Sequence, residues 1–113
     1  MKVLNISKNT ILGDKIDLAN TFIKRFLGLM PRKFLNHGEG LIINPCSSIH
    51  MFFMKFAIDV LFVDKNNKII YIEKCIKPWK VSKTIWKAKF VVELPDGTIE
   101  NSKTEVGDNI EIN

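Results

Sequence analysis

The sequence contains little cysteine, no long apolar run and no tract rich in proline, serine or glycine. The last absence argues against a disordered protein, and the other two exclude further classes. Its two cysteines, Cys46 and Cys75, make no disulfide framework, and both are expected as buried thiols in a reducing compartment. No apolar run approaches the roughly 20 residues of a membrane-spanning helix, and no signal segment is recognisable. No Cys-x2-Cys or His-x3-His pair offers a metal site. A cytoplasmic protein with no membrane partner, metal or cofactor is therefore expected.

The chain is also poor in arginine, although it is basic. Its net charge is +5, but of 17 basic residues only Arg25 and Arg32 are arginines, the residue best suited to phosphate and guanine. The segment from Lys74 to Lys89 interleaves lysines with Trp79 and Trp86, a pattern typical of proteins that bind single-stranded nucleic acid. Acidic residues further along could neutralise this segment as a neighbouring strand. Nucleic-acid binding is therefore not expected, and it stays a second alternative.

What the sequence has in abundance is short apolar segments separated by turn residues. Its 113 residues are expected to form one domain, residues 1–113, which is large enough for a hydrophobic core. This spacing predicts an all-β sandwich or barrel of about seven to eight short strands. The strands are expected within residues 1–5, 11–19, 41–44, 48–56, 58–63, 69–76, 90–94 and 109–112. The expected core residues are Phe52, Met54, Ile58, Val60, Phe62, Ile70, Ile72, Val92 and Ile110.

One segment changes to the helical period. Apolar residues recur at helical spacing from Ala19 to Leu27, which predicts one short helix at residues 21–27. Asn20 is the expected N-cap, and Gly28 is the expected stop. So short a helix cannot stand alone, and we expect its apolar stripe to pack against the sheet.

Several of these segments resemble the signature of a known family, the bacterial and archaeal "domain of unknown function 192". The matching residues are Arg25, Gly28-Leu29-Met30, Cys46, Ile49-His50, Phe53-Met54, Phe56, Ile58-Asp59-Val60, Phe62, Pro78-Trp79-Lys80 and Glu93. The chain departs from the family's pattern at Met51, where threonine is usual, and at Asp96, where alanine is frequent. The resemblance spans nearly the whole chain. It implies a jelly-roll-like sandwich and brings no assigned activity.

Asp59 is the most informative single residue, because it lies in a strand that is otherwise apolar on both faces. An unpaired carboxylate there would carry a large desolvation cost, so it needs a partner. We expect Arg25 within salt-bridge distance, with Glu93 as a third member. This group is either an ion pair that fixes the helix on the sheet, or a pocket in which arginine grips an anionic ligand.

Cys46 and His50 make a small enzyme the first alternative, because a nearby imidazole activates a thiol. On an extended strand the two residues lie about 13 Å apart, and no nucleophile elbow or oxyanion loop accompanies them. An enzyme would need Cys46, His50 and Asp59 to converge in one cleft.

The sequence favours a small non-catalytic binding or accessory domain whose ligand is a small molecule or carbohydrate. Strand alternation would place His50 and Phe52 on one face, and Phe53 and Lys55 on the other. One face would belong to the core, and the other would be a partly aromatic binding wall. The candidate ligand-binding residues are Arg25, His50, Phe53, Lys55, Asp59, Trp79 and Glu93.

Overall fold

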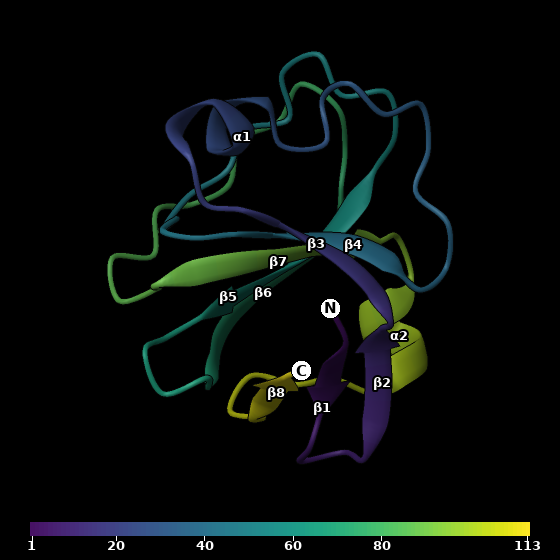
Figure 1. Ribbon diagram of the computed structural model, residues 1–113, viewed down its shortest axis with the longest axis vertical. Helices are drawn as coiled ribbons and strands as arrows, with labels where there is room; N and C mark the ends of the chain where they lie inside the picture. Colours follow the sequence, from purple (N-terminus) through teal and green to yellow (C-terminus); the bar gives the residue numbers. More distant parts are fainter.

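The computed structural model describes residues 1–113 and contains eight strands in two sheets with two short helices (Figure 1). The elements in chain order are β1 (Val3–Asn5), β2 (Thr10–Gly13), β3 (Lys15–Ala19), α1 (Phe22–Leu27), β4 (Glu39–Ile43), β5 (Ile58–Val63), β6 (Ile69–Ile76), β7 (Phe90–Pro95), α2 (Thr98–Ser102) and β8 (Ile110–Ile112). The all-β, sandwich-like class is confirmed, and the sheets are open rather than closed into a barrel. The expectation of a single helix is wrong, because Gly97 opens a second one, α2.

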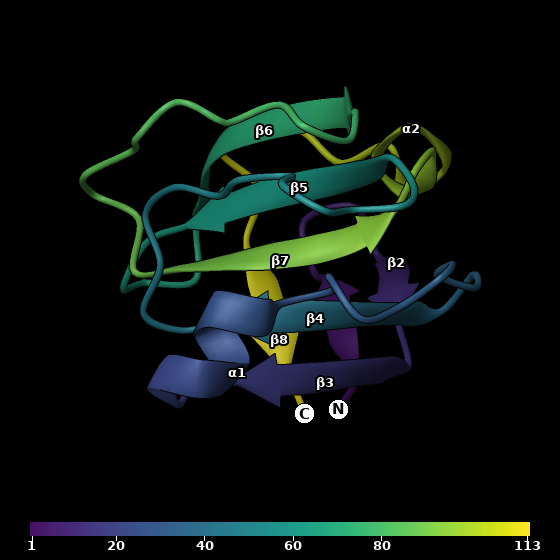
Figure 2. The ribbon, with the colours of Figure 1, turned by 90° about the horizontal axis from the view of Figure 1, so that it is seen from above.

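The larger sheet has the strand order β3-β4-β7-β5-β6, which Figure 2 shows from above. Its β3–β4 pair is parallel, and its other pairs are antiparallel. The smaller sheet has the order β2-β1-β8 and lies below the larger one in Figure 1, next to α2. Helix α1 and two long connections lie above the larger sheet. The larger sheet is therefore the middle layer.

Both faces of the larger sheet are buried, and strand alternation sorts the side chains between them. On β5, Val60 and Phe62 belong to the core under α1, whereas Leu61 and Val63 belong to the core between the sheets. On β7, Val91 faces α1 and its neighbour Val92 faces the small sheet. By the same alternation, Asp59 points toward the small sheet and Glu93 points toward α1.

The connection from Asn44 to Ala57 is a loop, so the strand expected at residues 48–56 is wrong. The loop is fixed by backbone hydrogen bonds to the connection from Lys77 to Lys89, among them Met51 N–H to the Lys80 carbonyl at 2.7 Å. Alternation fails where the chain turns, with Phe53 at φ 62°. Met51 and Met54 therefore both point inward, and Phe52 is 43% exposed instead of buried.

Three other expectations about the core are tested by burial. The residues Met54, Ile58, Val60, Phe62, Val92 and Ile110 are buried as expected. Ile70 and Ile72, on β6, are only half-buried, because this strand is the edge of the larger sheet. Cys75 is exposed and Cys46 half-buried, so the expectation of two buried thiols is wrong.

Helix α1 forms where its sequence pattern predicts it, but its apolar stripe faces outward. Thr21, rather than Asn20, is the N-cap, and its hydroxyl accepts the Lys24 amide at 3.2 Å. The side chains of Phe22 and Phe26 are 76% and 62% exposed. Six helical residues give little area to bury, and the anchor is Leu29, only 2% exposed, just after the helix. The expected packing of the stripe on the sheet is wrong.

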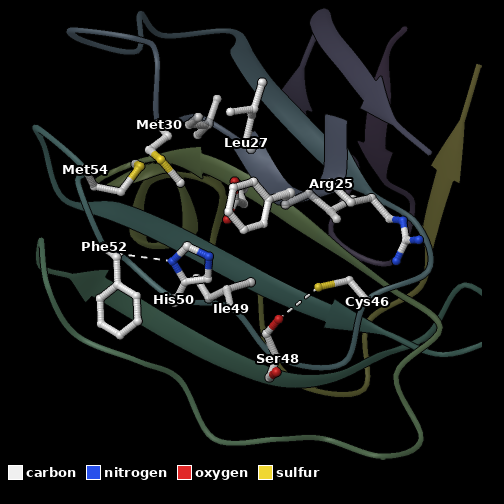
Figure 3. Close-up of a pocket in the computed structure, with 14 residues that line it drawn as sticks. Arg25, Leu27, Met30, Cys46, Ser48, Ile49, His50, Phe52 and Met54 are labelled. Carbon is white, nitrogen blue, oxygen red and sulfur yellow. Dashed lines mark hydrogen bonds between the residues drawn. The ribbon is translucent and has the colours of Figure 1, made fainter. Parts of the chain in front are cut away.

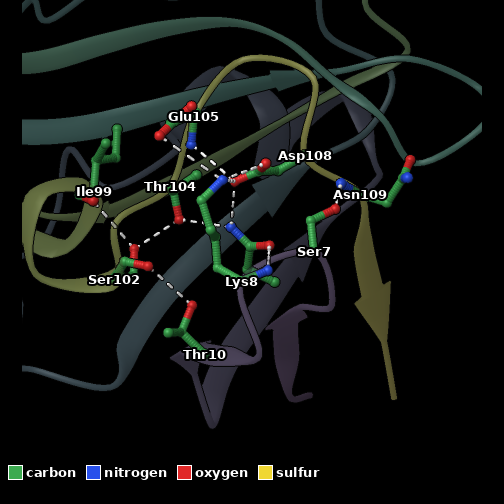
Figure 4. Close-up of polar contacts among 10 residues, drawn as sticks. Ser7, Lys8, Thr10, Ile99, Ser102, Thr104, Glu105, Asp108 and Asn109 are labelled. Atoms are coloured by element: carbon green, nitrogen blue, oxygen red, sulfur yellow. Dashed lines mark hydrogen bonds and ion pairs between the residues drawn. The ribbon is translucent and has the colours of Figure 1, made fainter.

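A buried polar network ties the C-terminal segment to the first hairpin (Figure 4). The Asn5 amide donates to the Thr104 hydroxyl at 3.0 Å and to the Asp108 carboxylate at 2.9 Å. Lys8 donates to the same carboxylate at 2.8 Å, and the Glu105 backbone amide donates at 2.9 Å. Burial would raise the pKa of Asp108, but the hydrogen bonds from Asn5 and Lys8 outweigh it and lower that pKa.

Candidate functional site

A small pocket lies on the α1 side of the larger sheet, between the end of α1, the 44–57 loop and β7 (Figure 3). Its volume is about 60 Å³, and nine of its 14 lining residues are hydrophobic. The lining residues are Arg25, Phe26, Leu27, Gly28, Leu29, Met30, Ile43, Cys46, Ser48, Ile49, His50, Phe52, Met54 and Glu93. We call this space the inner pocket.

A wider and shallower groove of about 520 Å³ adjoins the inner pocket. The two hollows share the residues Arg25, Phe26, Ile43, Cys46, Ser48 and His50. The groove adds Phe22 and Trp86, which are 76% and 85% exposed. We call this space the outer groove. Together they form a narrow apolar hollow with an aromatic mouth.

Glu93 is the buried polar group of the inner pocket. It sits in β7, between Leu41 on β4 and Val60 on β5, so its immediate strand neighbours are apolar. Glu93 is 4% exposed, and desolvation alone acts on its carboxyl group, with no hydrogen bond or ion pair to oppose it. Desolvation by burial raises the pKa of Glu93 from 4.5 to about 8, so at neutral pH the group is mainly protonated. The carboxyl group therefore faces the pocket as a neutral hydrogen-bond donor.

Arg25 occupies the last turn of α1 and lines both hollows. Its Nη1 reaches the Pro45 carbonyl at 3.5 Å, the outer limit of a hydrogen bond. Its Nε is buried without a hydrogen-bond partner. Figure 3 shows the guanidinium on the Cys46 side of the site, away from Phe52. Arg25 therefore carries an unused donor and a permanent positive charge at the junction of the hollows.

His50 and Cys46 complete the polar lining. The His50 Nδ1 accepts the Phe52 amide at 3.3 Å, so the proton of the neutral ring lies on Nε2. The Cys46 thiol donates to the Ser48 carbonyl at 3.0 Å (Figure 3). Desolvation by burial raises the pKa of the Cys46 thiol. Cys46 and His50 share no hydrogen bond, so the thiol lacks an activating base.

Asp59 does not belong to this site, and its expected ion pair with Arg25 is not formed. Its carboxylate, 1% exposed, accepts the backbone amides of Cys75 at 2.9 Å, Gly97 at 3.1 Å and Ile99 at 2.9 Å. Gly97 and Ile99 lie at the start of α2, so the Asp59 side chain, which comes from β5, caps the N-terminus of this helix. The cleft of Cys46, His50 and Asp59 that the enzyme alternative requires is therefore not formed, because Asp59 faces the opposite side of the sheet.

The other candidate residues lie near the pocket without lining it. Phe53 contacts Trp79 edge to face, with ring centroids 4.9 Å apart. Lys55 donates to the Met30 carbonyl at 3.1 Å and ties the 44–57 loop to the exit of α1. The structure thus brings Arg25, His50 and Glu93 together and leaves Phe53, Lys55 and Trp79 outside the cavity.

Sequence reasoning missed several lining residues. Phe52 was assigned to the core, and the outward-facing Phe22 and Trp86 were not proposed as binding residues. Gly28, predicted as the helix stop and matched to the family motif, also lines the pocket. At φ +51° it lets the chain pass close to the pocket, where an added Cβ would lie 3.9 Å from Glu93 Oε1. The motif Gly28-Leu29-Met30 was the available signal for this wall.

The fold and the pocket define a small two-sheet β domain whose middle sheet carries a small, mainly apolar pocket with a buried carboxyl group and an open groove beside it. No group of three or more His, Cys, Asp or Glu side chains is placed to hold a metal ion. Neither helix has the length and hydropathy to cross a membrane.

The chain belongs to the family DUF192, described as "Uncharacterized ACR", whose model matches residues 3–112. It is 39% identical to a UPF0127 protein of Pyrococcus furiosus, over 98% of this chain and 97% of that protein. It is 38% identical to a UPF0127 protein of Pyrococcus horikoshii, with 96% of each chain covered. A crystal structure of a protein of unknown function from Novosphingobium aromaticivorans superposes with a TM-score of 0.83 at 22% identity, covering 98% of this chain and 82% of that one.

Proposed function

We propose that this protein is a small non-catalytic binding module whose ligand occupies the inner pocket and the outer groove. The observation that carries the proposal is the unpartnered carboxyl group of Glu93, which is buried in the wall of a cavity. Buried polar groups are nearly always hydrogen-bonded, and an exception calls for an explanation. A ligand that supplies the missing partner provides one.

The other polar groups of the pocket support the same proposal. Arg25, which lines the same pocket, has its Nε buried without a hydrogen-bond partner. Desolvation and the absence of a Cys46–His50 hydrogen bond keep Cys46 as a thiol, which favours binding over nucleophilic catalysis. Because the walls are mainly apolar, a carbohydrate would leave hydroxyl groups without partners. A small molecule with an apolar body is the better match.

The test is a screen for binding by two-dimensional NMR with a mixed fragment set of acids, amines and neutral compounds. We expect hits that shift the backbone amides of Gly28, His50 and Glu93. Ser48→Trp should block the mouth of the pocket and abolish these shifts. Thr84→Trp adds the same side chain at an exposed position that lines neither hollow, and it should leave them unchanged. A screen with no hits at these amides, or hits that survive in Ser48→Trp, would overturn the proposal.

Two contacts of the segment from Lys74 to Lys89 support the view that its lysines form an ordinary solvent-exposed surface and do not bind nucleic acid. Lys74 pairs with Glu100 at 2.9 Å, and Lys83 lies over the Tyr71 ring at 5.9 Å from its centroid. The pairing with Glu100 is the kind of neutralisation expected from the acidic C-terminal part. We therefore continue to predict no strong affinity for single-stranded DNA or RNA at physiological salt. Micromolar binding with a steep salt dependence would contradict this prediction.

We also propose a cytoplasmic location, which the free thiols of Cys46 and Cys75 support, since such thiols persist in reducing compartments. Fractionation of expressing cells, with alkylation of Cys75 before lysis, tests it. Recovery of the protein outside the cytoplasm, or with Cys75 oxidised, would contradict the proposal.

A further inference from the structure

The polar groups that face the two hollows share a property that narrows the ligand class of the proposed function. Arg25 can only donate hydrogen bonds. His50 uses Nδ1 to accept the Phe52 amide, which leaves Nε2–H as a donor. Glu93 is buried with apolar strand neighbours and forms no ion pair, so its neutral form, which also donates, is the favoured one at neutral pH.

Two backbone carbonyl groups beside these donors are already in use. The Ser48 carbonyl accepts the Cys46 thiol, and the Pro45 carbonyl faces the Arg25 guanidinium. The lining contains one permanent cation, Arg25, and its only acidic residue is Glu93. The hydrogen-bond donors of Arg25, His50 and Glu93, together with the positive charge of Arg25, favour a ligand that is negatively charged and rich in hydrogen-bond acceptors.

The shape of the cavity sets the rest of the ligand. The inner pocket, at about 60 Å³, admits a small head group, and the outer groove, at about 520 Å³, admits a larger body. The groove's mouth carries the exposed rings of Phe22, Phe26 and Trp86. An apolar body on these rings would leave water on binding, which is the main source of affinity at such a surface.

We infer that the ligand is a small monocarboxylate with an apolar or aromatic body, its carboxylate turned toward the donors of Arg25, His50 and Glu93. This inference rests on the proposed function, because it names the ligand class for the same site. A carboxylate offers two acceptor oxygens, and a neutral Glu93 can donate to one of them without repulsion. An amine would instead face Arg25 and a carboxyl group that must first ionise.

The inference predicts that binding is linked to the proton on Glu93. The charged or titratable groups that line the inner pocket with Glu93 are Arg25 on α1 and Cys46 and His50 in the 44–57 loop, while its strand neighbours Leu41 and Val60 are apolar. Ionisation of Glu93 would put two negative charges in one pocket. The affinity for a carboxylate should therefore fall by about ten-fold per pH unit above the pKa of Glu93.

The experiment titrates three probes with the same body, namely 3-phenylpropanoate, 3-phenylpropylamine and 3-phenyl-1-propanol, by NMR and calorimetry. We expect the carboxylate to bind at least about ten-fold more tightly than the other two near pH 6.5, since its charge-assisted hydrogen bonds are the strong ones. Glu93→Gln keeps a neutral donor, so it should bind the carboxylate within about three-fold of wild type and lose the pH dependence.

A matched pair of variants tests the role of Arg25. Arg25→Gln should weaken carboxylate binding by about ten-fold or more. Lys24→Gln removes the same charge from an exposed neighbour that lines neither hollow, and it should change affinity by less than about two-fold because exposed charges are screened. Equal effects of the two variants would show that only net charge matters and would overturn the inference.

The remaining outcomes separate the inference from the proposed function. Tightest binding by the amine or the alcohol, or loss of carboxylate binding in Glu93→Gln, would overturn the ligand class and leave a binding module standing. Binding by none of the three probes, with other fragments shifting the Gly28, His50 and Glu93 amides, would do the same. A complete lack of hits at these amides would overturn both.

Discussion

Two buried carboxyl groups on neighbouring strands of the middle sheet are surrounded in opposite ways. Asp59 on β5 faces the small sheet and accepts three backbone amides. Glu93 on β7 faces α1 and has no hydrogen-bond partner. The first arrangement satisfies the charge and holds α2 in place, as structural carboxylates do. The second leaves a costly group beside a cavity, and this contrast is what supports the proposed binding site.

Asp108 extends the comparison to a third position. It is buried in the network of Figure 4, where Asn5, Lys8 and a backbone amide donate to it. Donors lower the pKa of Asp108, and their absence leaves desolvation to raise the pKa of Glu93. Burial alone therefore does not decide the direction of the pKa shift, whereas the supply of hydrogen-bond donors does.

The largest expected effect is on the pH dependence of stability in Glu93→Gln. The pKa of Glu93 is about 8 in the folded protein against 4.5 ordinarily, so the unfolded chain releases a proton first and stability falls as pH rises between these values. The ligand-free variant should match wild type near pH 4 and exceed it by roughly 4–5 kcal/mol near pH 8. Urea unfolding across this range measures the difference. Parallel profiles for the two proteins would mean that Glu93 has a hidden partner.

Asp59→Asn should act in the opposite direction. The amide group accepts through one oxygen only and turns a donor toward the backbone N–H groups of Cys75, Gly97 and Ile99. We expect a loss of about 3–4 kcal/mol in the free energy of unfolding at neutral pH, because buried donors lose their partners. Glu111→Gln, at an exposed position in β8, is the control and should change little. A neutral or stabilising Asp59→Asn would remove the distinction between Asp59 and Glu93.

Asp108→Asn should have a smaller cost, about 1–2 kcal/mol at neutral pH, because Asn5 and Lys8 keep one acceptor. Because the pKa of Asp108 is lowered in the folded protein, its contribution is present above the ordinary value of 3.8 and is lost as pH falls through the lowered pKa. The gap between variant and wild type should therefore close in acid. A gap that persists in acid would show that shape, and not charge, sets the role of Asp108.

The smallest expected effect is that of Arg25→Met on stability, below about 1 kcal/mol, since Arg25 makes one long hydrogen bond and no ion pair. In a double-mutant cycle with Asp59→Asn, the two losses should add within about 0.5 kcal/mol. Coupling of about 2 kcal/mol or more between Arg25 and Asp59 would instead restore the ion pair that the structure replaces with backbone contacts.

The sequence alone determined most of the architecture. The all-β class, the strands β5, β6 and β7, and the position of α1 follow from apolar periodicity and turn residues, which act over a few neighbouring residues. The same reading selected Arg25, His50 and Glu93 as candidates, and all three line the inner pocket. For Glu93, the residue type alone indicated a special position, because a buried strand rarely contains a carboxyl group without a specific reason.

Only the tertiary structure decided which partner each carboxyl group has. Asp59 accepts amides from Gly97 and Ile99, which lie 38 and 40 residues further along the chain, and a backbone donor leaves no trace in a sequence because every residue except proline carries one. Strand alternation sends Asp59 and Glu93 to opposite faces, but it cannot tell which face carries α1. The outward direction of the apolar residues of α1 and the turn at Phe53 also depend on contacts with residues distant in the sequence. These contacts override the pattern predicted from neighbouring residues.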